Sequence, residues 1–322
     1  MNHKKIAPLL IITAGCLWGA MGLFVRRLGA MGLGSMEIVE LRSILAVVML
    51  FPLTALRDRK LLRVKIRNLL PLACSGIFSI IFFNYCYFST IRLMNLSAAA
   101  ILLYTSPIFG MLLSIPLFHE KLTEQKVLAL FTAFGGCCLV SGVASASQRL
   151  TAQGILLGLG SGLGYALYSI FSRISLNQGL GSVTITDYTF LFAAFAGAFL
   201  TDFSQYAGAY QDFGASFLIL AVVYTIVTTV LPYLLYTAGL AHVENGAASI
   251  MASVEPVVAT ILGFLFFSET PTLSALLGII LVLAALILLS VKIPKKRLDI
   301  SIEYDKISLV LWTISSAGRA CA

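Results

Sequence analysis

The sequence has very little charge for its length. Only 11% of its 322 residues are charged, whereas 59% are hydrophobic, and soluble globular domains carry roughly 25% charged residues. This composition excludes an ordinary soluble domain and predicts an integral membrane protein. The net charge is +8, but the basic residues sit in short connections and form no continuous stripe. We therefore expect the lipid bilayer as a partner and no binding of nucleic acid.

The chain also lacks the motifs of enzymes and of metal sites. It contains no HExxH, no GxSxG and no dense acidic loop, so we predict that it is not an enzyme. Its six cysteines include no CxxC pair, and we expect reduced thiols, no metal and no cofactor. A non-transporting sensor or scaffold would normally carry a sizeable soluble domain, and the connections here are too short for one. We keep this function only as an alternative.

What the chain does have is a series of apolar runs. Each is about 18–24 residues long, near the length at which an α-helix crosses ~30 Å of hydrocarbon. We place ten spans at approximately 6–25, 36–56, 68–90, 96–117, 125–143, 153–174, 183–201, 214–238, 246–267 and 272–291. The fold class is therefore an all-α integral membrane protein with ten transmembrane helices.

Lysine and arginine are distributed unevenly between the loops. With a cytoplasmic N-terminus, the inner segments carry Lys4, Lys5, the cluster from Arg57 to Arg67, Lys121, Lys126, Arg173 and the basic residues of 292–297. The outer segments carry only Arg26, Arg27, Arg92 and Arg149. Because cytoplasmic loops are enriched in basic residues, we expect a multi-pass protein of the inner (plasma) membrane with both termini in the cytoplasm.

The two halves of the chain repeat each other. Ser97–Thr123 resembles Gly246–Thr272 at an offset of 149, with identities at Ala98, Ala99, Ile101, Pro107, Leu113, Phe118, Glu120 and Thr123. A weaker likeness aligns Trp18 and Arg26 with Tyr165 and Arg173 at an offset of 147. Five spans per half is an odd number, so the second copy enters the membrane upside down. We predict inverted repeats at 1–145 and 146–292, followed by a cytoplasmic polar tail at 293–322.

A resemblance to a known family rests on three features. These are Trp18-Gly19 in the first span and the paired segments Pro107…Glu120 and Glu255-Pro256…Glu269. Over roughly residues 6–291 the chain resembles the drug/metabolite transporter superfamily, and within it the EamA-type family. The resemblance implies a carrier of small organic solutes, with a central cavity lined by both halves.

Glu255 is the most informative single residue. It lies about ten residues into its span, or about 15 Å deep at 1.5 Å per residue, where an ionisable group is costly and usually functional. The following residue, Pro256, removes a backbone donor and should kink the helix. A structural role for Glu255 between helices is equally consistent with the sequence.

Other polar side chains fall on single helix faces. Ser161, Tyr165, Tyr168 and Ser172 follow helical spacing in the sixth span, as expected for the wall of a hydrated cavity. The candidate substrate-binding residues are Trp18, Asn84, Tyr87, Tyr104, Ser106, Tyr165, Tyr168, Tyr236 and Glu255. The alternative for each is an interhelical hydrogen bond.

Two further patterns concern packing and charge. Gly154, Gly158 and Gly162 recur every four residues, which favours close packing of the sixth span against a neighbour. Arg42 lies inside the second span; we expect it to reach the outer interface or to pair with Glu37 or Glu40. The alternative is a positive partner for an anionic group.

These observations predict a solute carrier that works by alternating access. The predicted wall of the central cavity is rich in hydroxyl groups and has few charges. This composition favours amino acids or related metabolites as substrates, with export as the direction. A drug-efflux carrier of the same fold is the alternative. We expect proton coupling through Glu255 as a hypothesis, and a monomer or a homodimer.

Overall fold

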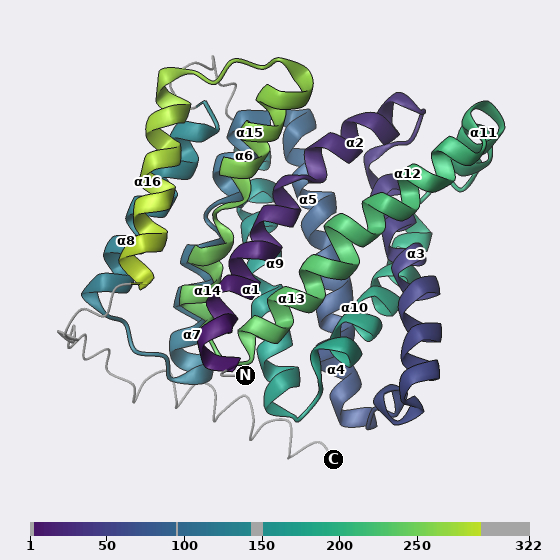
Figure 1. The fold of residues 1–322 in the computed structure, drawn as a ribbon, viewed down its shortest axis with the longest axis horizontal. Coiled ribbons are helices and arrows are strands. Elements are labelled where there is room, and N and C mark those ends of the chain that lie inside the picture. The colour runs from purple at the N-terminus through teal and green to yellow at the C-terminus, as the bar shows by residue number, and fades with distance from the viewer. Residues whose placement is uncertain (1–2, 95, 143–150, 291–322) are drawn as a thin grey trace.

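The computed structural model describes residues 3–94, 96–142 and 151–290, and these fold into a bundle of helices (Figure 1). Within these described residues, eight helical segments are long and apolar enough to cross a membrane. The predicted all-α membrane fold is thus confirmed, but the count of ten spans is not. The predicted spans at 125–143 and 272–291 correspond to shorter helices: α8 has 17 residues, and the apolar part of α16 covers Leu273–Leu289. The predicted tail at 293–322 lies outside the described residues.

The elements follow one another along the chain with short connections. In order they are α1 (His3–Gly19), α2 (Met21–Ala30), α3 (Ser35–Arg57), η1 (Arg59–Leu62), α4 (Ile66–Gly76), η2 (Ile77–Phe82), α5 (Phe83–Leu93), α6 (Leu96–Leu103), α7 (Ser106–Phe118), α8 (Glu124–Val140), α9 (Ala152–Asn177), α10 (Ser182–Gly197), η4 (Ala198–Leu200), α11 (Ser204–Phe213), α12 (Ala215–Thr225), η5 (Ile226–Val230), α13 (Leu231–Leu240), α14 (Asn245–Ala252), α15 (Glu255–Phe267) and α16 (Leu273–Ser290). We call the side at which α1 begins the N-terminal side, and the opposite one the far side.

Two predicted spans are broken near their middle, at equivalent points of the repeat. One is split into α6 and α7, the other into α14 and α15. Pro107 and Pro256 stand in the first turns of α7 and α15, where the missing N–H of proline costs no helical bond. The kink expected at Pro256 is therefore a complete break, and a second break lies at Pro107; in each, a new helix starts one residue before the proline.

The third and eighth spans share a different irregularity. Each contains a π-helical turn, η2 in the first half and η5 in the second. The two turns begin at Ile77 and Ile226, separated by the same 149 residues as the repeat. Such turns widen a helix locally and are frequent at functional sites.

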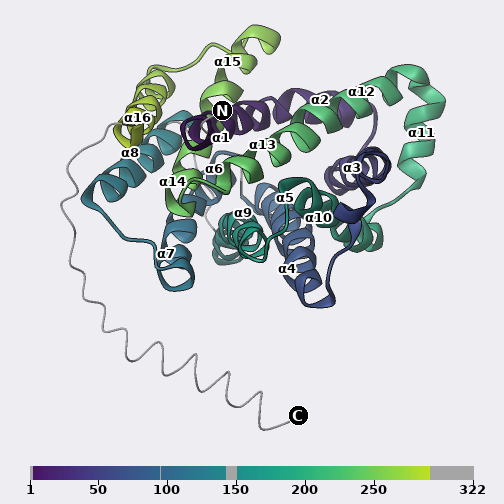
Figure 2. The ribbon, with the colours of Figure 1, turned by 60° about the horizontal axis from the view of Figure 1, so that its bottom comes forward.

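Small residues let the central helices approach closely, as the glycine spacing predicts. A Cβ on Gly158 or Gly162 of α9 would collide with Leu102 of α6, so this helix face packs against α6. The pair α8 and α16 lies at one edge of the molecule (Figures 1 and 2). There a Cβ on Gly136 would lie 2.7 Å from the carbonyl oxygen of Gly278.

Candidate functional site

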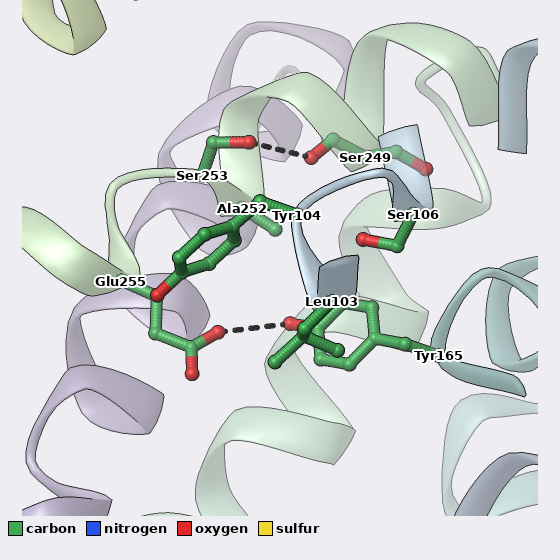
Figure 3. Close-up of a pocket in the computed structure, with 8 residues that line it drawn as sticks. All are labelled: Leu103, Tyr104, Ser106, Tyr165, Ser249, Ala252, Ser253 and Glu255. Atoms are coloured by element: carbon green, nitrogen blue, oxygen red, sulfur yellow. Dashed lines mark hydrogen bonds between the residues drawn. The ribbon is translucent and has the colours of Figure 1, made fainter. Parts of the chain in front are cut away.

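The centre of the molecule holds a carboxylate at a helix break. Glu255 is the first residue of α15, and the hydroxyl of Tyr165 on α9 donates a hydrogen bond to its Oε2 at 3.1 Å (Figure 3). Both flank a cavity of about 10 Å³, which is close to the space that one water molecule needs. The residues that line it are Leu103, Tyr104, Ser106, Tyr165, Ser249, Ala252, Ser253 and Glu255.

Two helix N-termini meet at this cavity. Ser106 begins α7 in the first repeat, and Glu255 begins α15 at the equivalent position of the second. A helix N-terminus carries partial positive charge, which favours an anionic group beside it. The repeat thus brings two such ends to mid-membrane, and only one of them carries a carboxylate of its own.

An aromatic cluster adjoins the carboxylate. The ring of Trp18 on α1 lies 6.1 Å from that of Tyr165, 5.2 Å from that of Tyr233 and 5.3 Å from that of Tyr236, measured between centroids. Trp18 is buried, and its indole Nε1 has no hydrogen-bond partner among the described residues. Trp18 and Tyr165 are repeat-related, so the contact between them joins the two halves.

Tyr233 was not among the predicted site residues. It contacts Trp18, Tyr168 and Phe190 through edge-on ring contacts of about 5 Å. One signal could have identified it: Tyr233 lies three residues before Tyr236, so the two share a helix face.

Tyr168 and Tyr236 lie outside the lining of the cavity. The hydroxyl of Tyr168 is 2.6 Å from Oγ1 of Thr237, and that of Tyr236 is 2.6 Å from Oγ of Ser169. Both pairs connect α9 with α13, and neither tyrosine lines the cavity. Their contacts match the interhelical hydrogen bonds that the sequence left open as an alternative.

Asn84 and Tyr87 on α5 also lie outside the lining of the cavity. The side-chain amide of Asn84 donates to the carbonyl of Ile80 on its own helix at 2.7 Å. The ring of Tyr87 packs against Phe83 and Phe88. Of the nine predicted residues, the structure therefore brings Tyr104, Ser106, Tyr165 and Glu255 to the cavity and Trp18 to its aromatic wall.

Arg42 corrects an expectation. Its side chain is 1% exposed, so it does not reach the interface, and no ion pair with Glu37 or Glu40 is present among the described residues. One guanidinium nitrogen, Nη1, lies 3.8 Å from Sδ of Met21, and Nε has no hydrogen-bond partner. The guanidinium interacts electrostatically with Glu255, Tyr233 and Tyr224. Helix packing turns Arg42 inward because α2 and α12 cover α3 at this level.

On the N-terminal side a buried contact holds the two halves together. Glu120, which follows α7, accepts the backbone N–H of Asn245 at 2.6 Å and of Gly246 at 3.2 Å. Arg173 donates to Oδ1 of Asn245 at 2.9 Å and to the carbonyl of Val243. The carboxylate of Glu120 therefore caps the N-terminus of α14, where Asn245 is fully buried. We call this set of bonds the N-side contact.

On the far side the repeat-related residues make a different contact. Nη1 of Arg26 lies 2.5 Å from Oε1 of Glu269, with the two side chains 49% and 52% exposed. The guanidinium also lies 4.5 Å from the ring centroid of Phe267. Among the described residues Glu269 forms no hydrogen bond to the start of α6, the helix equivalent to α14, and Leu96 there is 58% exposed. We call the Arg26–Glu269 pair the far-side contact.

Residues 5–142 and 152–291 each match the EamA-like transporter family. The chain belongs to this family. The resemblance drawn from the paired Pro…Glu segments is thereby confirmed, because the two matches together cover most of the chain. EamA proteins are part of the drug/metabolite transporter superfamily.

The relatives agree with a transport role. The chain is 28% identical to an uncharacterized transporter of Archaeoglobus fulgidus, over 86% of this chain and 94% of that protein. It is 25% identical to the uncharacterized transporter YxxF of Bacillus subtilis, over 90% and 91%. One solved crystal structure has the same fold, with a TM-score of 0.73 at 17% identity over 88% of this chain and 96% of that one. The protein is therefore a multi-pass membrane transporter.

Proposed function

We propose that this transporter carries amino acids or related small metabolites, with export as its direction, by alternating access. The observation that supports this most is the mid-membrane junction at Glu255. There two broken helices from inverted repeats meet, together with a carboxylate and several hydroxyls. Discontinuous helices at the repeat interface are where secondary transporters place their substrates.

The charges around the junction suit a zwitterion. Glu255 offers a carboxylate to an ammonium group, with Tyr165 holding it in place. The start of α7 at Ser106 and the guanidinium of Arg42 offer positive potential to a substrate carboxylate. Sugar phosphates would need more cationic groups at this depth.

The two end contacts support alternating access. In an inverted repeat, the arrangement on one side should be adopted by the equivalent residues on the other side when the transporter changes state. Here Glu120 caps α14, while Glu269 pairs with Arg26. We infer that in the opposite state Glu269 caps α6 and Glu120 releases α14.

An organic cation is the second candidate substrate, as in drug efflux. Trp18 and the three tyrosines around it form an aromatic wall next to a carboxylate. Cations are attracted to aromatic faces by ~0.5–2 kcal/mol. An organic cation would use this wall and Glu255 but not Arg42, which distinguishes it from an amino acid.

The membrane and the orientation are also proposals. The excess of Lys and Arg in the loops of the N-terminal side supports a cytoplasmic location for both termini, and the inner (plasma) membrane is the location proposed. Glu255 is the proposed carrier of a coupling proton, since it is ionisable and lies at mid-membrane.

Thermal stabilisation of the purified chain by amino acids, metabolites and organic cations, followed by flux in proteoliposomes, tests this function. Amino acids should raise the melting temperature and be carried. If Glu255 binds the ammonium group, Glu255→Gln should lose binding. If it carries the proton, the variant should keep binding and lose pH-gradient-driven uptake.

The exposed Glu124 supplies a matched control, because Glu124→Gln removes the same charge away from the cavity. Wild-type binding together with wild-type gradient dependence in Glu255→Gln would contradict both roles of Glu255. Absence of stabilisation and flux with every amino acid would refute the proposed substrate class, and transport of organic cations alone would favour the second candidate.

A further inference from the structure

Two buried carboxylic acids lie away from the cavity, and the repeat relates them. Glu40 is the sixth residue of α3, and Asp187 is the sixth residue of α10. They are separated by 147 residues, the offset that also relates Trp18 to Tyr165. Because the repeats are inverted, Glu40 lies toward the far side and Asp187 toward the N-terminal side.

Both acids are buried, and within the described residues neither forms an ion pair. Glu40 is 1% exposed and Asp187 is 0% exposed. All four carboxyl oxygens lack a hydrogen bond within the described part of the chain, and neither residue takes part in its ion pairs. Burying an ionised carboxylate without a partner costs several kcal/mol. The neutral acid, which carries a proton, is the form that fits each site.

Each acid is covered by the other helix of the pair α3 and α10, which lie side by side (Figure 2). Near the far side, Glu40 fills the space left by Gly197 on α10, where a Cβ would overlap its Oε2. Near the N-terminal side, Asp187 faces the hydroxyl of Thr54 on α3. The two ends of one helix pair therefore each enclose one acid.

In the part of the chain that the structure describes, no cation forms an ion pair with either acid. On the helix of Glu40, Glu37 accepts the backbone N–H of Asp202 at 3.2 Å, and Arg42 directs a guanidinium nitrogen to Met21. From α11, outside the spans, Tyr206 donates to the carbonyl of Glu37 at 2.8 Å. Burial raises the pKa of Tyr206, so this phenol stays neutral.

Beside Asp187, the neighbouring Tyr188 donates to the carbonyl of Leu62 at 2.7 Å. Its hydroxyl is therefore occupied elsewhere. The Thr54 hydroxyl on α3 is neutral, so it brings no charge to Asp187 either.

We propose that Glu40 and Asp187 are a symmetry-related pair of proton-binding sites, one near each side of the membrane. While α3 and α10 are packed at a given end, the acid there keeps its proton. When the helices separate at that end, water reaches the carboxyl, its O–H bond breaks and the proton passes to water. The exchange step rests on the proposed alternating motion, whereas the presence of the two protons does not.

Infrared spectroscopy of the purified full chain in lipid nanodiscs at neutral pH tests the bound protons without any substrate. The carbonyl stretch of a protonated carboxyl group is the band to measure. Glu40→Gln and Asp187→Asn should each remove one component of it, and the double variant should remove both. Glu37→Gln is the matched control; its carboxylate has a backbone N–H partner, so the band should be unchanged.

An unchanged band in the double variant would overturn the proposal, and loss of a component in only one single variant would overturn the pairing. Gly197→Ala gives a second measurement if Glu40→Gln does not fold. It keeps Glu40 but crowds its carboxyl, so the Glu40 component should shift while the Asp187 component stays. No shift in this variant would count against the assignment of Glu40. The infrared measurement uses no substrate. Its outcome therefore does not depend on whether the chain transports amino acids.

Discussion

Neutralising Glu120 should open the N-terminal side of the transporter. In Glu120→Gln the anion that accepts two backbone N–H groups of α14 is lost, at distances of 2.6 and 3.2 Å in the native chain. Hydrogen bonds to charged groups contribute about 1.5–3 kcal/mol each. The side chain of Glu120 is only 10% exposed, so solvent screens these bonds little. Since a glutamine oxygen still accepts one bond, we expect a net loss of about 1.5–3 kcal/mol.

This loss of free energy should raise the ratio of molecules open on the N-terminal side to molecules closed there by about 10- to 150-fold. The same substitution at Glu269 should do far less, because both partners of the far-side contact are about half exposed. Exposed ion pairs contribute about 0.2–1 kcal/mol. The repeat-related glutamates are thus predicted to have unequal effects in this conformation.

A single reporter cysteine measures the opening. Ser249 lines the cavity and is 8% exposed, so Ser249→Cys, in a chain whose natural cysteines are replaced, reports access to the centre. A membrane-impermeant thiol reagent is added from the N-terminal side of oriented vesicles. Labelling should become about 10- to 150-fold faster in Glu120→Gln and unchanged in Glu124→Gln, a control on the same side. An unchanged rate in Glu120→Gln would refute the role of the N-side contact.

Two more predictions concern packing and charge. Gly136→Ala should destabilise the protein by about 1–3 kcal/mol, because its Cβ would lie 2.7 Å from the carbonyl oxygen of Gly278; Gly135→Ala, with nothing within 4 Å, should be tolerated. Thermal unfolding in detergent compares the two variants, and equal melting temperatures would contradict the packing of α8 on α16. Arg42→Gln should weaken amino-acid binding by about tenfold or more, as expected for a lost charge-assisted bond of about 1.5–3 kcal/mol. It should leave organic-cation binding intact, and a parallel loss of both in ligand titrations would show that Arg42 acts only through the fold.

Much of the architecture could be predicted from sequence because a bilayer allows few solutions. Every backbone group must be bonded inside the chain, so apolar runs become helices. The breaks at Pro107 and Pro256 follow from proline chemistry. Even the helix ends repeat: α7 and α15 stop at His119 and Ser268, two left-handed residues with φ of 54° and 55°. The breaks depend on prolines that the two halves share, whereas the matching helix ends form at two different residues, His119 and Ser268.

The site was only partly predictable. Glu255 and Tyr165 stood out as polar residues deep in apolar runs, and the structure joins them by a hydrogen bond. Asn84 stood out for the same reason, yet its amide bonds to its own helix. Spacing identifies the face on which a residue lies, but the rotation of the helix decides what that face meets. That rotation also brought Tyr233 to Trp18 and turned Arg42 inward.

By itself, the sequence determined the membrane fold, its duplication and the positions of its breaks, because hydrophobicity, proline and loop charge act locally. Only the tertiary structure decided how the two halves differ. Glu120 and Glu269 follow matching helices, but one caps α14 inside the protein and the other pairs with an exposed arginine. The repeated glutamates allow either contact, the helix cap or the ion pair, on either side. Which one each side adopts is set by the packing of the halves against each other, and no local pattern records that packing.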